Sequence, residues 1–297
     1  MIKCIAFHSY KGGTGKTTIA ANFAALLTKK GYRVFLMELD VYAPSLHTYF
    51  DMEPIKWLND FLNGTAEIRD VVTDLTPTIT SSHNNNNPVD GKLYVGFCNP
   101  NKEEIYKLDY GGKQDSPRIQ LLRRLILLRE QIILTYGADY IIIDTSPGIR
   151  YWSINALGIA DTLFLTLKMG SLDIDGTKKM VTDIYSSFLK FGAKSHLVLN
   201  KMAGYCTPPQ ITVNVATPSL SDNSYNKSFT IQQQEESNYD ISSKFSKEVD
   251  MNVICTIPCH CDIQFSTKEF LTVLKCPDHP FAKRLEALAE DKHIKIN

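Results

Sequence analysis

An apolar run followed at once by a glycine-rich turn and a helical stretch most constrains the fold of this 297-residue chain. Residues 2–8 read IKCIAFH, and residues 9–18 read SYKGGTGKTT. The first run predicts a strand, and the alanine- and leucine-rich residues 16–30 predict a helix. Glycine supplies the turn because it adopts backbone conformations that are closed to other residues. A strand, a tight turn and a helix in this order predict an α/β fold.

The same alternation of apolar runs and helical stretches continues along the chain. Runs such as YIIID at 140–144 are apolar almost throughout, which is typical of strands buried on both faces of a sheet. We therefore predict an α/β fold with a doubly wound, mostly parallel sheet flanked by helices, and a ligand at the carboxyl ends of its strands. The predicted strands are 2–8, 33–39, 92–97, 140–144, 162–167, 196–200 and 252–257, and the predicted helices are 16–30, 117–136, 172–191 and 279–290.

Two polar segments interrupt the alternation, at about 78–91 and at 203–239. Residues 80–88 read TSSHNNNNP, and the second segment is rich in Ser, Asn, Thr, Gln and Pro, so neither can bury a core. We interpret both as surface insertions in a single domain that spans residues 1–297. A loop that docks a partner is the alternative, and the sequence does not distinguish the two.

The composition excludes a global attraction to nucleic acid or membrane, because 32 Lys and Arg balance 32 Asp and Glu. No stretch reaches the roughly 18 to 20 apolar residues of a membrane span. The first residues, MIKCIAF, run directly into the glycine-rich turn and leave no room for a signal peptide. Seven cysteines, an odd number, favour reduced thiols. These features predict a soluble, cytoplasmic protein.

The glycine-rich turn has the residues of a phosphate-binding loop. Gly12, Gly13 and Gly15 let backbone N–H groups surround phosphate oxygens, and the following helix adds its positive dipole end. In such a loop Lys16 reaches the β- and γ-phosphates, and the Thr17 hydroxyl is a ligand of Mg²⁺. The general pattern G-x-x-x-x-G-K-[ST] expects glycine at position 10, where this chain has tyrosine with a second lysine beside it.

The stretch KGGTGKT at 11–17 resembles the deviant phosphate loop of the MinD/ParA family of ATPases, and the resemblance extends to about residue 290. It implies a P-loop NTPase fold, ATP and Mg²⁺ as cofactors, and an ATP-dependent homodimer in which two subunits enclose two nucleotides. It also implies that Lys11 reaches the partner's ATP, where it stabilises charge as an arginine finger does. The implied nucleotide-binding residues of the loop are Lys11, Gly12, Gly13, Thr14, Gly15, Lys16, Thr17 and Thr18.

Two aspartates follow predicted strands and match further motifs of the family. Asp40 lies in ELDVYAPSL at 38–46, and the resemblance implies that it orients the attacking water and supports the Mg²⁺ shell. Asp144 ends the run YIIID, which matches a Walker B motif whose carboxylate holds Mg²⁺ through water. The implied catalytic residues are Lys11, Lys16 and Asp40, and the implied metal ligands are Thr17, Asp40 and Asp144.

The purine base is expected beside the last two predicted strands. Asn200 ends the run HLVLN, and the resemblance implies that it contacts the purine amino group and N7. Pro258 ends VICTIP at 253–258 and is expected to flank the base. A guanine-reading N-K-x-D motif needs aspartate at position 203, where this chain has alanine. We therefore expect ATP rather than GTP.

The segment DVYAPSL at 40–46 is similar to that of the Mrp/ApbC branch, whose members carry iron–sulfur clusters and have a C-P-x-C pair. The candidate cysteines here are Cys255, Cys259, Cys261 and Cys276, and the first three are spaced C-x₃-C-x-C. We interpret them as core or loop thiols, with metal binding as the alternative. Nitrogenase-type reductases and bacterial tyrosine kinases are excluded, because 145–160 lacks cysteine and the final KHIKIN lacks tyrosine.

Other partners are constrained more weakly. Phe281, Leu285 and Leu288 recur at helical spacing, which favours packing on the sheet, so membrane binding through the C-terminal end is not expected. The basic pairs at 123–124 and 283–284 allow non-specific DNA binding but are more typical of solvated helix faces. The resemblance implies an activating partner protein and leaves the cargo and the cellular process open.

Three functions therefore remain open at this point. The first is a slowly hydrolysing ATPase whose ATP-dependent dimer positions or partitions a partner or cargo. The second is an iron–sulfur cluster carrier of the Mrp/ApbC type. The third is a nucleotide-bound regulator with little hydrolysis, in which Lys11 and Asp40 serve dimerisation alone.

Overall fold

Eight strands form a single sheet in the order β3-β4-β2-β5-β1-β6-β7-β8. The computed structural model describes residues 2–80, 90–101, 103–104, 117–168, 170–190, 192–202, 240 and 242–296. Every neighbouring pair of strands is parallel except β3 with β4. The strands are β1 (Lys3–His8), β2 (Arg33–Leu39), β3 (Val72–Asp74), β4 (Lys92–Gly96), β5 (Tyr140–Thr145), β6 (Thr162–Leu167), β7 (Lys194–Met202) and β8 (Val253–Pro258).

The seven strands predicted from the sequence are all present, with ends that differ by two residues at most. The strand β3, which lies at the edge of the sheet and pairs antiparallel with β4, was not predicted from the sequence. This strand has three residues, VTD, so it is too short and too polar to stand out as an apolar run. Its pairing with β4 depends on a contact between separate segments, which local sequence does not record.

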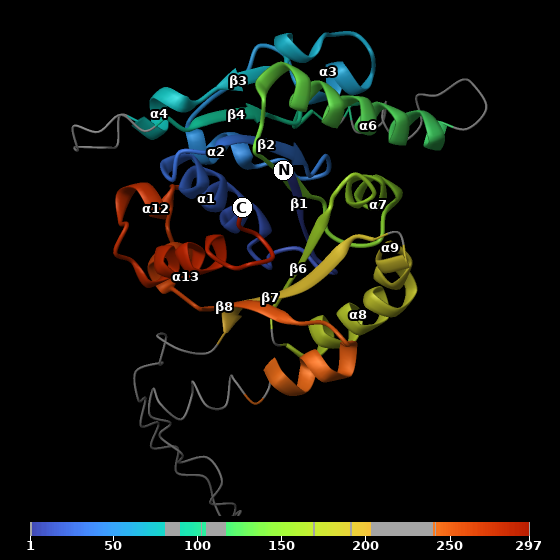
Figure 1. Cartoon of the computed structure of the whole chain (residues 1–297), viewed down its shortest axis with the longest axis vertical. Helices are drawn as coiled ribbons and strands as arrows, with labels where there is room; N and C mark the ends of the chain where they lie inside the picture. The colour runs from blue at the N-terminus through green and yellow to red at the C-terminus, as the bar shows by residue number, and fades with distance from the viewer. Residues whose placement is uncertain are drawn as a thin grey trace, which may run out of the picture.

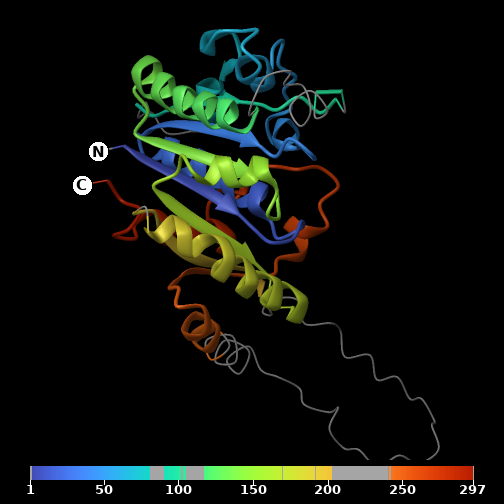
Figure 2. The same ribbon diagram turned by 90° about the vertical axis from the view of Figure 1, so that its right-hand side faces the viewer.

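Helices cover both faces of the sheet (Figure 1), and the turned view in Figure 2 shows the same layers from the side. Alternate residues of β1 explain why both faces are apolar: Cys4 and Ala6 belong to one buried cluster, and Ile5 and Phe7 belong to the other. The first face carries α3 (Leu58–Leu62), α6 (Pro117–Tyr136), α7 (Tyr151–Leu157), α8 (Ser171–Met180) and α9 (Ser186–Lys190). The second face carries α1 (Lys16–Lys29), α2 (Leu46–Phe50), α4 (Thr76–Thr80), α12 (Thr272–Lys275) and α13 (Pro280–Ala289).

The helix predicted over 172–191 is not one regular helix. A π-helical turn, η2 (Val181–Tyr185), separates α8 from α9, so the path of the chain changes within the segment. The shorter helices were not predicted, because they are too short to show a clear period. They are α2, α3, α4, α7, α11 (Cys261–Gln264) and α12, together with the 3₁₀ turn η1 (Ile68–Asp70). Of the two predicted insertions, residues 78–80 belong to α4, whereas 81–89 and 203–239 lie outside the described residues.

The amphipathic helix α13 packs its apolar side into the protein. Phe281, Leu285 and Leu288 are buried in the cluster that also contains residues of α1 and β8, as the sequence predicted for this helix. Lys283 on its outer side forms ion pairs with Asp278 and Glu286, both at 3.3 Å. No described helix has the length and apolarity needed to cross a bilayer.

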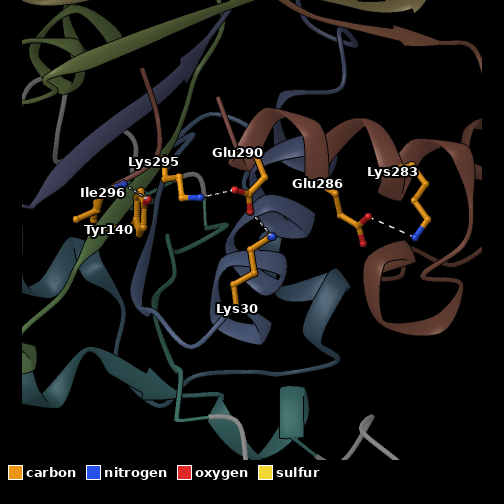
Figure 3. A network of polar contacts seen from close by, with 7 residues as sticks. All are labelled: Lys30, Tyr140, Lys283, Glu286, Glu290, Lys295 and Ile296. Atoms are coloured by element: carbon orange, nitrogen blue, oxygen red, sulfur yellow. Dashed lines mark hydrogen bonds and ion pairs between the residues drawn. The ribbon is translucent and has the colours of Figure 1, made fainter. Parts of the chain in front are cut away.

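A polar network holds the residues that follow α13 against the sheet (Figure 3). Glu290 accepts hydrogen bonds from Lys30 and Lys295, each at 2.7 Å. The Tyr140 hydroxyl accepts one from the backbone N–H of Ile296 at 3.1 Å. These ion pairs are exposed, so each contributes little by itself, but together the contacts attach this segment to the end of α1 and to β5.

Candidate nucleotide-binding site

The carboxyl ends of β1, β2, β5 and β7 meet at one edge of the sheet, at the start of α1. The strand β1 pairs with β5 on one side and with β6 on the other. The chain leaves β1 toward β2 on the side of β5, and it leaves β6 toward β7 on the opposite side. The connections after these two neighbouring strands therefore diverge, which opens a crevice between them. A cavity of about 420 Å³ lies there. The predicted site residues that line it are Gly12, Gly13, Gly15, Lys16, Thr17, Thr18 and Asp40.

The loop between β1 and α1 has the backbone that its glycines predict. Gly13 and Gly15 have positive φ angles of 73° and 89°, which favour glycine. A Cβ at position 15 would also collide with the side-chain amide of Asn200 and lie 3.6 Å from its Cγ. Lys16, Thr17 and Thr18, the first residues of α1, line the same cavity. The free N–H groups and the dipole of a helix N-terminus favour an anion such as phosphate.

The two lysines of the loop have different surroundings. Lys16 is 5% exposed, and its Nζ donates a hydrogen bond to Ser9 Oγ at 3.0 Å. Burial lowers the pKa of Lys16, and the charges of Asp144 and Asp40 oppose this. Lys11 is half-buried, and within the described part of the chain its ammonium group has neither a hydrogen bond nor an ion pair. Ser9 Oγ donates to the Lys11 carbonyl at 2.6 Å, so the loop holds the backbone of Lys11 and leaves its charge available.

Asp144 at the end of β5 is a buried carboxylate that fits a bound cation. It is fully buried, and among the described residues neither of its oxygens has a hydrogen-bond partner of good geometry. Burial raises the pKa of Asp144 to about 7, against the charge of Lys16 and the nearby Thr17 hydroxyl. A buried acceptor without a donor is costly unless a ligand satisfies it. Carboxylate and hydroxyl oxygens are the ligands that Mg²⁺ prefers, so Asp144 and Thr17 suit this ion.

Asp40 joins the loop after β2 to the segment after β5. Its Oδ1 accepts hydrogen bonds from the Ala43 backbone N–H at 3.2 Å and from Ser146 Oγ at 2.9 Å. The side chain is 8% exposed and lines the cavity. Asp40 is therefore held in place by two segments that both border the expected phosphate position.

Asn200 and Pro258 line a second, smaller cavity of about 120 Å³ next to the loop. Asn200 Nδ2 donates to the Thr14 carbonyl at 2.8 Å, so the orientation of its amide is determined by this acceptor. The opposite edge of the amide presents Oδ1, an acceptor that suits the amino group of adenine and disfavours the carbonyl of guanine. Thr18 borders both cavities, and its hydroxyl shares a hydrogen bond of 2.8 Å with the Tyr49 hydroxyl.

A family model described as the CobQ/CobB/MinD/ParA nucleotide binding domain matches residues 5–270 of this chain. The chain belongs to this family. The match confirms the MinD/ParA resemblance of its phosphate loop.

Solved MinD structures share the fold over nearly the whole chain. MinD of Pyrococcus horikoshii, solved with Mg-ADP, has a TM-score of 0.64 at 19% identity and covers 99% of this chain and 97% of that one. MinD in its complex with MinC from Aquifex aeolicus has a TM-score of 0.67 at 15% identity, with the same coverage. At these identities the likeness establishes the fold.

Curated relatives match over shorter stretches. The flagellum site-determining protein YlxH of Helicobacter pylori is 29% identical over 150 residues, which cover 50% of this chain and 42% of the relative. The iron–sulfur cluster carrier protein of Aquifex aeolicus is 51% identical over 49 residues, 16% of this chain and 14% of the relative. This chain thus spans less than half the length of these relatives.

In the part of the chain that the structure describes, the cysteines do not form the cluster site that the Mrp/ApbC resemblance offered as an alternative. Cys255 is buried in β8, and burial raises the pKa of its thiol to about 12. Cys261 is disulfide-bonded, which corrects the expectation of reduced thiols at this residue. Within the described part of the chain, the group with the spacing of metal ligands is instead His260, Asp262 and His279, and it contains no cysteine.

The tautomer of His279 argues against a metal at this group. Its Nδ1 accepts a hydrogen bond from the Phe281 backbone N–H at 3.1 Å, so Nε2 carries the proton and donates to Asp262 at 3.0 Å. A metal on Nε2 would displace that proton and require Nδ1 to carry one, which would remove the cap of α13. We interpret the group as a structural contact at the start of α13.

Glu38 in β2 is a residue of the site that the sequence analysis missed. Its side chain is fully buried and accepts backbone hydrogen bonds from Ser45 and Leu46 at 2.7 Å and from Cys98 at 2.9 Å. These contacts shape the loop that carries Asp40 along the cavity. The available signal was a single acidic residue inside the apolar run RVFLMEL.

The cavity also has cationic residues that were not predicted. Arg150 lines it, with its guanidinium group 4.1 Å from the centre of the Tyr42 ring. Lys201, which has a positive φ of 55°, borders both cavities. Arg150 lies outside the motifs recognised in the sequence, and Lys201 was considered only as part of the N-K-x-D comparison, so the approach of both residues to the site depends on the fold.

Proposed function

We propose that this chain binds ATP with Mg²⁺ and pairs with a second copy in the ATP state, with each Lys11 contacting the nucleotide of the other subunit. One observation carries the proposal: the two lysines of a single loop have different surroundings. Lys16 is buried and held by Ser9, which suits contact with the nucleotide of its own subunit. Lys11 is half-buried and its ammonium has no partner in the described structure, which suits contact with a group that arrives from outside.

The remaining roles follow from the surroundings of each side chain. Thr17 and Asp144, with Asp40 in the surrounding shell, would hold Mg²⁺, which neutralises charge on the phosphates when bound. Asp40 would orient the water that attacks the γ-phosphate, because two segments fix its carboxylate beside the cavity. Asn200 and Pro258 would hold adenine, and the loop from Gly12 to Thr18 would surround the phosphates.

We further propose that hydrolysis is slow and that the dimer acts as a switch, in the cytoplasm, that positions a partner or cargo. The support comes from the names of related proteins. One relative is named a flagellum site-determining protein, another a putative replication protein, and one solved structure is a MinC:MinD complex. A partner that recognises the paired state and stimulates hydrolysis would make such a switch reversible.

The two lysines provide the decisive experiment. Lys16→Ala should weaken ATP binding in the monomer by roughly ten- to hundredfold, the value of a buried charge-assisted contact. Lys11→Ala should leave monomer affinity unchanged and abolish ATP-dependent dimerisation, measured by light scattering in an Asp40→Ala background that blocks hydrolysis. A dimer that forms equally well without Lys11 would refute the proposal.

Mixing two inactive variants tests the trans arrangement directly. In a heterodimer of Lys11→Ala and Asp40→Ala subunits, the nucleotide on the first subunit has its own Asp40 and the second subunit's Lys11. ATP hydrolysis should therefore partly return in the mixture although neither variant hydrolyses alone. If heterodimers form and hydrolysis does not return, Lys11 does not act across the interface.

Two other functions stay as alternatives with less support. A cluster carrier is supported by the short match to the Aquifex aeolicus carrier but not by the cysteine positions in the described structure. An absorbance band near 400 nm in anaerobically purified protein would favour it. A regulator with little hydrolysis would dimerise with ATP as proposed, yet release no phosphate when its partner is added.

A further inference from the structure

Tyr10 stands where the general phosphate loop has glycine, and its side chain is not left in solvent. The ring is partly buried and packs against the apolar cluster on the face of the sheet that carries α8. Its hydroxyl has no hydrogen bond in the described structure, so the ring itself makes the contact. Tyr10, which departs from the general loop pattern, therefore packs against a specific part of the protein.

That partner is the backbone of Gly176 in the middle of α8. A Cβ at position 176 would lie 2.8 Å from Cζ of Tyr10 and closer still to two other ring carbons, so only glycine admits the ring. Gly176 is not among the glycines with positive φ, so its backbone would accept alanine. Glycine disfavours a helix interior, and here the absent side chain is what lets the ring approach.

The same helical segment contacts the end of β1 a second time. The rings of His8 and Tyr185 are stacked, with centroids 6.2 Å apart and an interplanar angle of 23°. Tyr185 ends the π-helical turn η2 that follows α8. His8 and Tyr10 flank Ser9, so α8 and η2 support the chain on both sides of that residue.

Ser9 in turn holds the backbone that leads to Lys11. The Ser9 carbonyl accepts a hydrogen bond from the Gly148 backbone N–H at 2.8 Å, and Ser9 Oγ donates to the Lys11 carbonyl. Lys11 is thus attached to a segment fixed by the Tyr10 ring, by Ser9 and by the loop after β5. A lysine side chain has many rotamers, so fixing its backbone reduces the entropy lost when its ammonium meets a phosphate.

We propose that Tyr10, seated on Gly176, is a positioning residue that aims Lys11 at the nucleotide of the partner subunit. This inference rests on the proposed function, because it gives Lys11 its role across the interface. Tyr10 lines neither of the two cavities of the site, so it acts through the backbone of its neighbour. Its loss should therefore affect pairing while leaving ATP binding by the isolated subunit intact.

The test uses the full chain with Asp40→Ala, so that ATP is bound but not hydrolysed. Two quantities are measured: the dissociation constant of the dimer with ATP and Mg²⁺, by analytical ultracentrifugation, and the ATP affinity at protein concentrations too low for pairing. Tyr10→Ala should weaken the dimer by about tenfold, within the range of coupling between contacting residues, and leave monomer affinity unchanged. Tyr10→Phe keeps the ring and should pair as the parent does.

Gly176→Ala is the matched variant, because it adds one methyl group at the contact. With Tyr10 present it should weaken the dimer by a similar factor, since the methyl displaces the ring. In a Tyr10→Ala background Gly176→Ala should not change the dissociation constant of the dimer further, because the added methyl group then has no Tyr10 ring to displace. If Gly176→Ala leaves the dimer unchanged, or weakens it equally with and without Tyr10, the positioning role is refuted.

The outcomes separate this inference from the proposed function. If the parent dimerises with ATP and Lys11→Ala abolishes pairing, but the Tyr10 and Gly176 variants do not alter it, only the inference fails. If the parent does not dimerise with ATP, the proposed function fails and the positioning role fails with it. If Tyr10→Ala lowers monomer ATP affinity as much as pairing, Tyr10 supports the whole loop rather than Lys11.

Discussion

Glu38 and Asp144 occupy equivalent places at the ends of two neighbouring strands but have opposite surroundings. They are direct partners in the register of β2 and β5, and both are fully buried. Glu38 accepts three backbone N–H groups, from Ser45, Leu46 and Cys98. Asp144 has no such donor in the described structure. Two carboxylates of equal burial and nearly equal position therefore have different uses.

The difference shows that burial alone does not identify a site residue. Burial raises the pKa of both groups, to about 8 for Glu38 and to about 7 for Asp144. The two carboxylates differ in the source of the hydrogen-bond donors that offset the cost of burial. The chain itself supplies them for Glu38, which makes it a structural residue, and leaves Asp144 for a ligand from outside.

The largest expected effect is on folding, through Glu38. Glu38→Ala leaves three N–H groups without an acceptor, and those of Leu46 and Cys98 are buried. The free energy of unfolding should therefore fall by about 3 kcal/mol, at about 1 to 3 kcal/mol for each buried group. Glu38→Gln retains one carbonyl acceptor and should lose less. Urea denaturation measures both, with the exposed Glu53→Ala as control. A loss below 1 kcal/mol for Glu38→Ala would contradict the structural role of Glu38.

The second effect concerns Asp144 and should appear in ligand binding rather than in folding. Asp144→Asn removes a buried carboxylate that lacks a well-placed hydrogen-bond donor, but it also removes a charge that favours the buried Lys16, so the stability of the apo protein should change little. The Mg²⁺ concentration needed for ATP to raise the melting temperature should increase by about 10- to 100-fold, or ~1.4 to 2.7 kcal/mol. A variant that loses stability but binds Mg²⁺ and ATP normally would reverse the two roles.

Asn200 is intermediate, because one edge of its amide is held by the chain and the other faces the smaller cavity. Nδ2 is used by the Thr14 carbonyl, so Oδ1 should accept from adenine and repel the guanine carbonyl. ATP should therefore bind about tenfold more tightly than GTP, given ~1 to 3 kcal/mol for a lost hydrogen bond to a buried group. Asn200→Ala should reduce this preference in calorimetric titration. Equal affinities for the two nucleotides in the parent would contradict the assignment.

The smallest expected effect is the pH dependence of stability that Glu38 confers. Its pKa rises from 4.5 in the unfolded chain to about 8 in the folded protein, so between these values the folded state holds a proton that the unfolded state lacks. This stabilisation is complete below pH 4.5 and is lost as the pH rises through 8. Between pH 6 and 7 the parent should lose about 1 kcal/mol relative to Glu38→Gln. Parallel pH profiles of the two proteins would show that Glu38 does not titrate in this way.

Much of the fold was predictable because its strands differ from their surroundings in local composition. Runs such as Thr162–Leu167 are apolar on both faces, and the structure has a strand there with the same ends. The edge strand Val72–Asp74 was missed because it has no apolar run. The phosphate loop was predictable for a similar reason, since residue type and spacing within ten positions determine its backbone.

Other features required contacts between segments that the sequence does not connect. The sequence located Asp40, Asp144 and Asn200 at strand ends, but only the fold shows which side-chain atoms are already used. The cysteine pattern pointed to an alternative metal site, and packing placed Cys255 in the core instead.

The sequence by itself thus determined most of the strands, the longer helices, the phosphate loop and the family, because these depend on neighbours along the chain. Only the tertiary structure decided that Glu38 is satisfied by the loops after β2 and β4, and that Tyr10 rests on Gly176. Such pairings depend on how the helices and loops pack over the sheet. No residue carries that information alone, because a side chain's partners are defined only when distant segments meet.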